Sequence, residues 1–178
     1  MRRILLTLFL SVYFVGFAQM DDYQRDIVDL LRINGTVLDY GETYDKVFES
    51  LKVQFGTGDV PESYWTKLQR DRKAQLDELL PDLAYGYRKH FSHEEIKEML
   101  AIYQRESVQE AVLMQRELRE VDDSKVKRFA KSDLGRKMVR VQPELKKDLD
   151  EIAAYWKKDI FKLKMQALIR DGYRAGRN

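Results

Sequence analysis

The chain has 178 residues, of which 44% are hydrophobic and 35% are charged, and its formal net charge is +2. It contains no cysteine, which excludes disulfides, thiolate nucleophiles and cysteine-ligated metal sites. A chain of this length forms one domain and buries about 70% of the surface that it exposes when unfolded.

The first residues have the pattern of a secretory signal peptide. Arg2 and Arg3 precede an apolar run over residues 4–17, and the small residues Gly16 and Ala18 fit a cleavage site before Gln19. The run is shorter than the 20 or so residues of a membrane-spanning helix. We therefore expect residues 1–18 to be a signal peptide, and residues 19–178 to be one exported helical domain, periplasmic or extracellular, without a transmembrane segment.

The charge of the expected mature chain is divided unevenly along the sequence. Residues 19–123 carry a net charge of −9, and residues 124–178 carry a net charge of +9. In one interpretation, the acidic and basic halves pack against each other, so that their opposite charges attract. In the other, the basic half presents a face to an anionic surface. We favour the first interpretation, because charged faces are usually solvated or paired. Export argues against nucleic acid as a partner.

Helical periodicity dominates the rest of the chain, in chain order. A first helix is expected to stop at Asn34-Gly35, a typical C-terminal cap, and a second to follow over residues 37–55. Helical patterns then cover residues 61–91, where Pro81 interrupts or kinks the pattern. The spacing predicts a long central helix from Ser92 to about Val121, and further helix from about residue 125 to Gly172, punctuated at Ser132-Asp133 and at Pro143. The fold class is all-α, a Pro-kinked bundle of about five to seven helices.

The stretch "YRKHFSHEEIKEML" contains the only two histidines, His90 and His93. A zinc site needs three or four ligands, so these histidines would have to recruit a carboxylate such as that of Glu94. Ser92 and Glu95 have the spacing of a capping box, which would begin a new helix between the two rings. We therefore favour helix punctuation over a metal site or an acid–base pair, and expect no catalytic residue and no cofactor.

The C-terminal helix has two apolar stripes. The first contains Leu149, Ile152, Trp156, Ile160, Leu163 and Ala167, and the second, expected on roughly the opposite side, contains Phe161, Met165 and Leu168. Lys157, Lys158, Lys162 and Lys164 flank the second stripe. The favoured interpretation is a helix buried on two sides. The alternative is a basic amphipathic face, made of these four lysines and the second stripe, for a partner helix or an anionic membrane.

Several segments resemble the bacterial family called domain of unknown function 2059. They are "VPESYWTKLQRD", "LDELLPDLAYGYRKHFSHEEIKEMLAIYQ", "FAKSDLGRKMVRVQPEL" and "ALIRDGY", and they cover most of residues 60–173. The family's short signature, similar to "FYxSPxGKK", is divided here between "AIYQ" and "KSDLGRKM", with Asp133 where proline is common. The resemblance implies an exported all-α protein with a helical insertion at about 105–130. It supplies no activity.

Two hypotheses about function follow from the sequence. The first is a non-catalytic exported domain that binds a partner protein or an apolar or anionic component of the cell envelope. The alternative is a metal-dependent or hydrolytic enzyme built around His90, His93 and nearby carboxylates.

Overall fold

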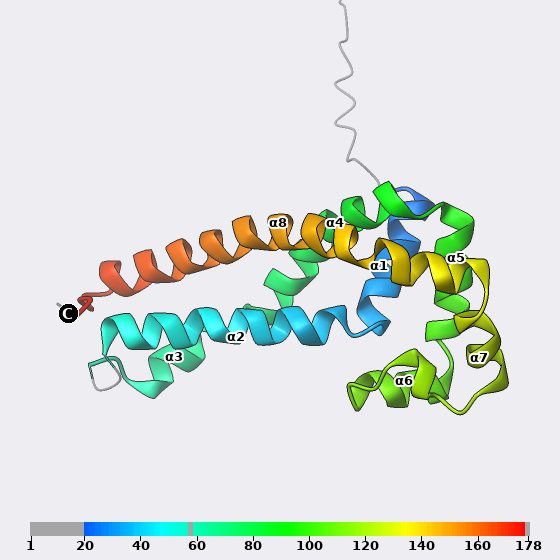
Figure 1. The fold of residues 1–178 in the computed structure, drawn as a ribbon. Coiled ribbons are helices and arrows are strands. Elements are labelled where there is room, and N and C mark those ends of the chain that lie inside the picture. Colours follow the sequence, from blue (N-terminus) through cyan, green and yellow to red (C-terminus); the bar gives the residue numbers. More distant parts are fainter. Residues whose placement is uncertain (1–19, 57–58, 177–178) are drawn as a thin grey trace, which may run out of the picture.

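The computed structural model describes residues 20–56 and 59–176, and all regular structure in these ranges is helical (Figure 1). The helices are α1 (Asp22–Ile33), α2 (Thr36–Phe55), α3 (Glu62–Leu68), α4 (Arg72–His90), α5 (His93–Tyr103), α6 (Glu106–Leu113), the 3-10 helix η1 (Leu118–Glu120), α7 (Ser124–Ala130) and α8 (Asp133–Arg170). The all-α prediction is confirmed, as is the long C-terminal helix. The expected signal peptide lies outside the described residues.

Local capping chemistry sets several helix ends where the sequence predicts them. Asn34 caps the C-terminus of α1, and Gly35 has a φ of 96°, a conformation that glycine adopts without a steric penalty. Ser92 and Glu95 form both hydrogen bonds of a capping box at the start of α5. The Ser132 hydroxyl accepts a hydrogen bond from the Gly135 amide and starts α8.

The long central helix expected from Ser92 to Val121 is wrong, because α5 ends at Tyr103. A turn follows, and the Arg105 guanidinium reaches across it to Asp123, with 2.6 Å between Nη2 and Oδ2. The side-chain amide of Gln109 donates to the carbonyls of Ile33 and Tyr103. These bonds stabilise the turn between α5 and α6, and residues 105–130 form α6, η1 and α7 around a small apolar cluster.

Neither internal proline ends its helix. Pro143 lies inside α8, where it removes the hydrogen bond to the carbonyl of Val139. Both residues are exposed, so water can solvate that carbonyl, and the punctuation expected at Pro143 is absent. Pro81 likewise lies inside α4. Helices α3 and α4 are joined by a bend at residues 69–71. When these two are counted as one bent helix, the described part of the chain has seven α-helices.

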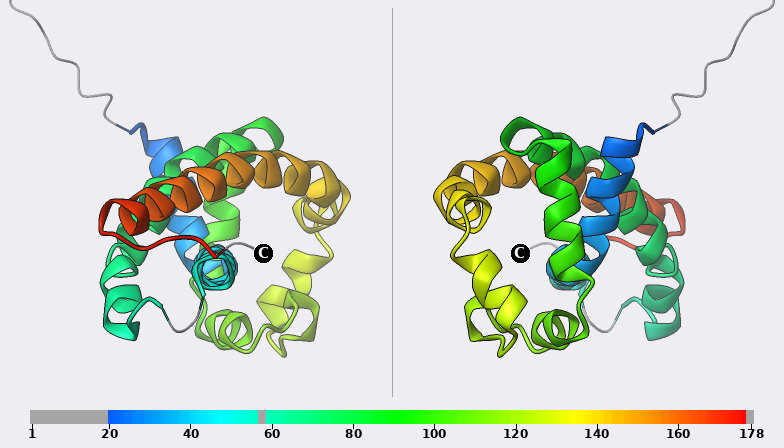
Figure 2. Two further views of the ribbon diagram at one scale, coloured as in Figure 1. Left: turned by 90° about the vertical axis from the view of Figure 1, so that its left-hand side faces the viewer. Right: turned by 90° about the vertical axis from the view of Figure 1, so that its right-hand side faces the viewer.

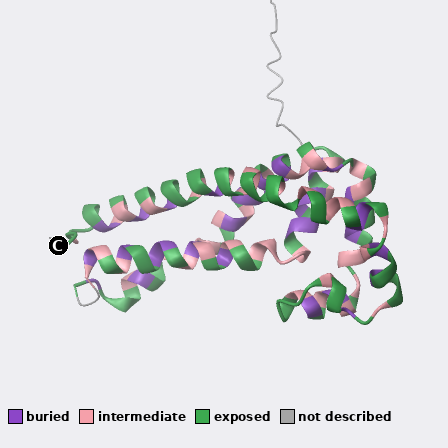
Figure 3. Cartoon of the chain, in the orientation of Figure 1, coloured by how far each residue is buried: buried purple, intermediate pink, exposed green. Residues whose placement is uncertain are grey.

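Two larger apolar cores hold the helices together. The first lies among α1, α4 and α5, and the second lies among α2, α3 and the C-terminal half of α8. Helix α8 runs along both, and its outer face is exposed (Figure 3). The indole of Trp156 packs against both cores. In the end views, α3 and the α6–α7 segment lie on opposite sides of α2 (Figure 2).

None of the helices in the described part of the chain has the length and apolar character needed to cross a membrane.

Candidate functional site

The two histidines bind different carboxylates on different helices. The Nε2 atom of His90, at the end of α4, lies 2.9 Å from Oδ2 of Asp148 on α8. The Nε2 atom of His93, at the start of α5, lies 2.6 Å from Oδ2 of Asp26 on α1. The ring of His93 also stacks on Tyr23, with 5.0 Å between centroids. Each histidine therefore ties one helix to another.

The surroundings of these pairs are those of structural contacts. Lys89 and His90 both hydrogen-bond Asp148 and lower the pKa of its carboxyl group. Glu94, the carboxylate considered for metal binding, is exposed and pairs with Lys97 instead. Within residues 20–56 and 59–176, no three His, Asp or Glu side chains are grouped as metal ligands would be.

The interaction surface considered on the C-terminal helix is divided by the structure. Leu168 is fully buried, and Phe161 and Met165 are half-buried against the α2 core, so the favoured core interpretation holds for Leu168 and in part for the other two. Leu163, counted with the first stripe, is instead 52% exposed. The two stripes are not on opposite sides of α8. The buried face of the helix joins them, because it contains Ile160 from the first stripe, Lys164, and Leu168 from the second.

Lys164 is therefore a core residue and no part of an exposed basic face. It is 5% exposed, and its Nζ atom donates to Oδ2 of Asp71 at 2.6 Å and to the carbonyl of Leu68 at 2.8 Å. The buried hydroxyl of Tyr44 donates to the other oxygen of Asp71 at 2.8 Å. Partial burial raises the pKa of the Asp71 carboxyl group, but the hydrogen bonds from Lys164 and Tyr44 outweigh it and leave a lowered pKa.

An open groove of about 780 Å³ lies between α4 and α8. Residues spaced by three, four and seven on each helix line it: Gln75, Glu78, Asp82 and Tyr85 from α4, and Ile152, Tyr155, Trp156, Asp159, Ile160, Lys162, Leu163 and Gln166 from α8. Tyr85, Tyr155 and Leu163 are each more than half exposed. We call this surface the α4–α8 groove.

The α4–α8 groove combines apolar and acidic character. Large exposed apolar side chains gathered at one place are typical of a binding surface. Three carboxylates, those of Glu78, Asp82 and Asp159, line the groove against a single lysine, Lys162. The groove therefore matches a ligand that is apolar and positively charged.

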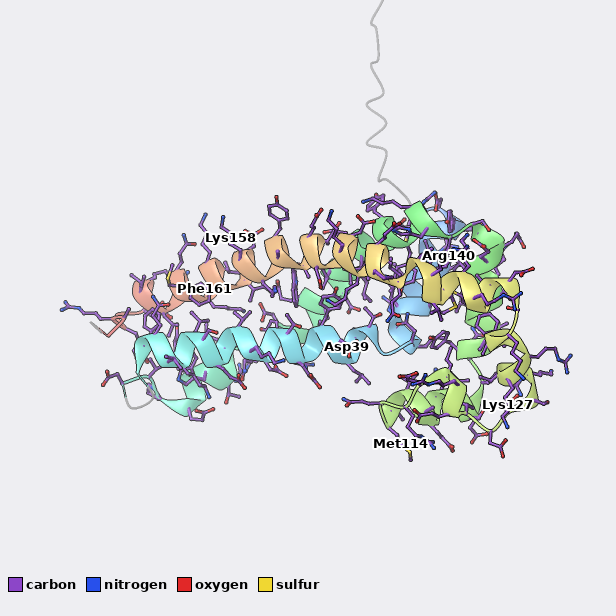
Figure 4. The ribbon with its side chains drawn as sticks, viewed as in Figure 1. Asp39, Met114, Lys127, Arg140, Lys158 and Phe161 are labelled. Carbon is purple, nitrogen blue, oxygen red and sulfur yellow. The ribbon has the colours of Figure 1, made fainter. Side chains whose placement is uncertain are left out.

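A second groove, of about 530 Å³, lies between α2 and α8. It is lined by Thr43, Lys46, Val47, Ser50, Lys157, Lys158 and Phe161. We call it the α2–α8 groove, and Figure 4 shows Lys158 and Phe161 on the half of α8 that runs alongside α2. Three residues of the predicted interaction surface, Lys157, Lys158 and Phe161, thus meet here, while Lys162 lies in the α4–α8 groove.

Sequence reasoning missed the α4 wall of the first groove. Gln75, Glu78, Asp82 and Tyr85 follow one another at steps of three, four and three residues, which keeps them on one side of a helix. That spacing was a usable signal, but only the position of α8 shows that this face is uncovered.

No protein-family model, curated protein or solved structure matches the chain. The resemblance to the domain of unknown function 2059 family therefore stays an expectation from the sequence.

Proposed function

We propose that the chain is an exported, non-catalytic helical domain that binds a partner protein through the α4–α8 groove. One observation carries the proposal: Tyr85, Tyr155 and Leu163 are exposed together in a groove that is bordered by carboxylates. Burial of such side chains by a partner contributes about 25 cal/mol for each Å² of apolar surface removed from water. The non-catalytic part of the proposal is supported by the separate pairing of His90 and His93.

The shape and charge of the groove favour an amphipathic basic helix as the bound segment. The α8 wall presents apolar side chains at three- and four-residue spacing, and the α4 wall adds Tyr85. A groove of this kind is typical of a helix-in-groove site. Lysine or arginine on the bound helix would face Glu78, Asp82 and Asp159, which raises the rate of encounter and fixes orientation.

A pair of designed peptides tests this proposal. One is a helix of leucine and lysine of about 18 residues, which spans about 27 Å, and the other replaces every lysine with glutamate. The fluorescence of Trp156 reports binding in a Trp65→Phe background, since these are the two tryptophans of the chain. We expect the lysine peptide to bind at least ten times more tightly than the glutamate peptide.

Matched variants locate the binding site. Leu163→Ala and Asp159→Lys should each weaken binding of the lysine peptide about tenfold. Their controls are Leu113→Ala and Glu110→Lys, exposed residues of α6 outside the groove. Equal loss in the controls, or equal binding of both peptides, would contradict the proposal.

Export is tested separately. We expect the chain recovered from the producing cell's envelope or medium to begin at Gln19, as measured by N-terminal sequencing. Recovery of a chain that still begins at Met1 would contradict this part of the proposal.

A further inference from the structure

The residues that line the α2–α8 groove include three lysines and no carboxylate. Lys46 from α2 and Lys157 and Lys158 from α8 line it, and no acidic residue does. Three other lysines of α8 are paired: Lys137 binds Glu95, Lys146 binds Asp150, and Lys164 binds Asp71. Within residues 20–56 and 59–176, none of the three groove lysines forms such a pair. The groove is thus a concave site whose lining residues carry a charge of +3.

Two hydroxyl groups give the groove a further property. Thr43 donates its proton to the carbonyl of Asp39, and Ser50 donates its proton to the carbonyl of Lys46, both at 3.0 Å. Each hydroxyl proton is therefore already used, while the oxygen can still accept a hydrogen bond. The groove can donate to an anion through its lysines and accept from hydroxyl groups of the same ligand.

Apolar side chains continue the two walls toward one end of the molecule. Val53 lies seven residues after Lys46 on α2, so these two side chains share a side of that helix. Ile169 lies eight residues after Phe161 on α8, so these two also share a side of their helix. Val53 is 75% exposed and Ile169 is 55% exposed. Helices α2 and α8 run side by side and end together (Figure 1), where the Gly176 amide donates to the Gln54 carbonyl.

We propose that this face docks on an anionic phospholipid surface. The three lysines bind lipid phosphates, Thr43 and Ser50 accept hydrogen bonds from headgroup hydroxyls, and Val53 and Ile169 enter the boundary between headgroups and acyl chains. A row of lysines beside exposed apolar side chains has the chemistry of an interfacial membrane site. Phosphatidylglycerol, which combines a phosphate with free hydroxyls, matches the donors and acceptors of the groove. The inference does not depend on the partner proposed for the α4–α8 groove.

Vesicle sedimentation tests the inference. Every described helix lies within residues 20–176, so the protein used is residues 19–178, with circular dichroism and thermal melting to confirm folding of each variant. We expect binding to vesicles that contain phosphatidylglycerol and little binding to vesicles of phosphatidylcholine alone. Binding should weaken as salt is added, because exposed charges are screened over about 8 Å at physiological ionic strength.

Variants assign the binding to the groove. Each lysine near an anionic surface contributes about fivefold in affinity, so Lys46→Gln combined with Lys157→Gln should weaken binding about 25-fold. The control is Lys125→Gln with Lys131→Gln, which removes the same charge from exposed positions outside the groove. Glu49 is spaced at three residues from Lys46 and borders the groove, so Glu49→Gln should strengthen binding.

Three results would overturn the inference. One is equal sedimentation with anionic and neutral vesicles. Another is an equal loss in the groove double variant and in its control. The third is full displacement from vesicles by free glycerol phosphate at the same phosphate concentration, which would assign the groove to a soluble polyol phosphate.

Discussion

Lys164 and Asp71 form an ion pair whose two members differ in their access to water. The distance between Nζ and Oδ2 is 2.6 Å, and the side chain of Lys164 is 7% exposed while that of Asp71 is 35% exposed. The pair joins the C-terminal half of α8 to the turn before α4, and it is completed by Tyr44 and by the Leu68 carbonyl. Removal of Asp71 and removal of Lys164 should therefore lower the free energy of unfolding by different amounts.

Loss of the carboxylate should cost more than loss of the ammonium. Asp71→Asn leaves a buried charge without its partner, and we expect it to lower the free energy of unfolding by about 3 kcal/mol. Lys164→Met leaves a carboxylate that water can reach, so about 1 kcal/mol is expected. Urea denaturation of both variants measures the difference. Lys73→Met, which breaks the exposed pair with Asp77, is the control and should change stability by less than about 0.5 kcal/mol.

The pair between Arg105 and Asp123 predicts a loss of stability in acid. Hydrogen bonds from Arg105 lower the pKa of the Asp123 carboxyl group from 3.8 to about 2, with help from the Lys125 and Val126 amides. A group whose pKa is lowered on folding stabilises the folded state above its unfolded pKa and loses that contribution as the pH falls through its folded pKa. Stability should therefore fall between about pH 4 and about pH 2.

Titration of variants checks this assignment. Asp123→Asn should flatten the dependence of unfolding free energy on pH in that window, while lowering stability at pH 7. Glu110→Gln, at an exposed position within α6, is the matched variant that also removes one carboxylate. An identical slope in Asp123→Asn and the parent chain would show that this ion pair does not form in solution.

The capping box at Ser92 predicts a local stability effect. Its hydroxyl accepts from the Glu95 amide, and the Glu95 carboxylate accepts from the Ser92 amide at 2.8 Å. Ser92→Ala should lower the free energy of unfolding by about 1 kcal/mol. Thermal melts compared with Ser63→Ala, at an exposed position inside α3, test the effect; equal melting temperatures would refute the role of the cap.

Alanine substitutions at Leu168 and Phe161 should differ in their cost in stability, because one side chain lies in the core and the other at its edge. Leu168 is fully buried in the α2 core, so Leu168→Ala should lose about 2–5 kcal/mol. Phe161 is half-buried at the edge of the α2–α8 groove, so Phe161→Ala should lose about 1–2 kcal/mol, for burial of part of its ring. Chemical denaturation that ranked the two in the reverse order would contradict this placement.

The accuracy of sequence-based prediction here depended on the range of the interactions involved. The C-terminal end of α1 and the starts of α5 and α8 are set by residues within three or four positions, and these were predicted. The turn after Tyr103 depends on the contact between Arg105 and Asp123, and a continuous helical pattern does not show that contact. The burial of Lys164 depends on Asp71, 93 residues away, and the two grooves depend on how α2 and α4 lie against α8.

The contact of Trp156 with both larger cores has a consequence for hydrogen exchange. Helix α8 has 38 residues and is about 57 Å long, at 1.5 Å a residue. Because its central turns pack on both cores, neither core can open without exposing them. The amides around Ala153 and Ile160 should therefore exchange with deuterium only through global unfolding, with one shared free energy of opening. The α6–α7 segment, which has its own small apolar cluster, should exchange earlier, as a separate unit.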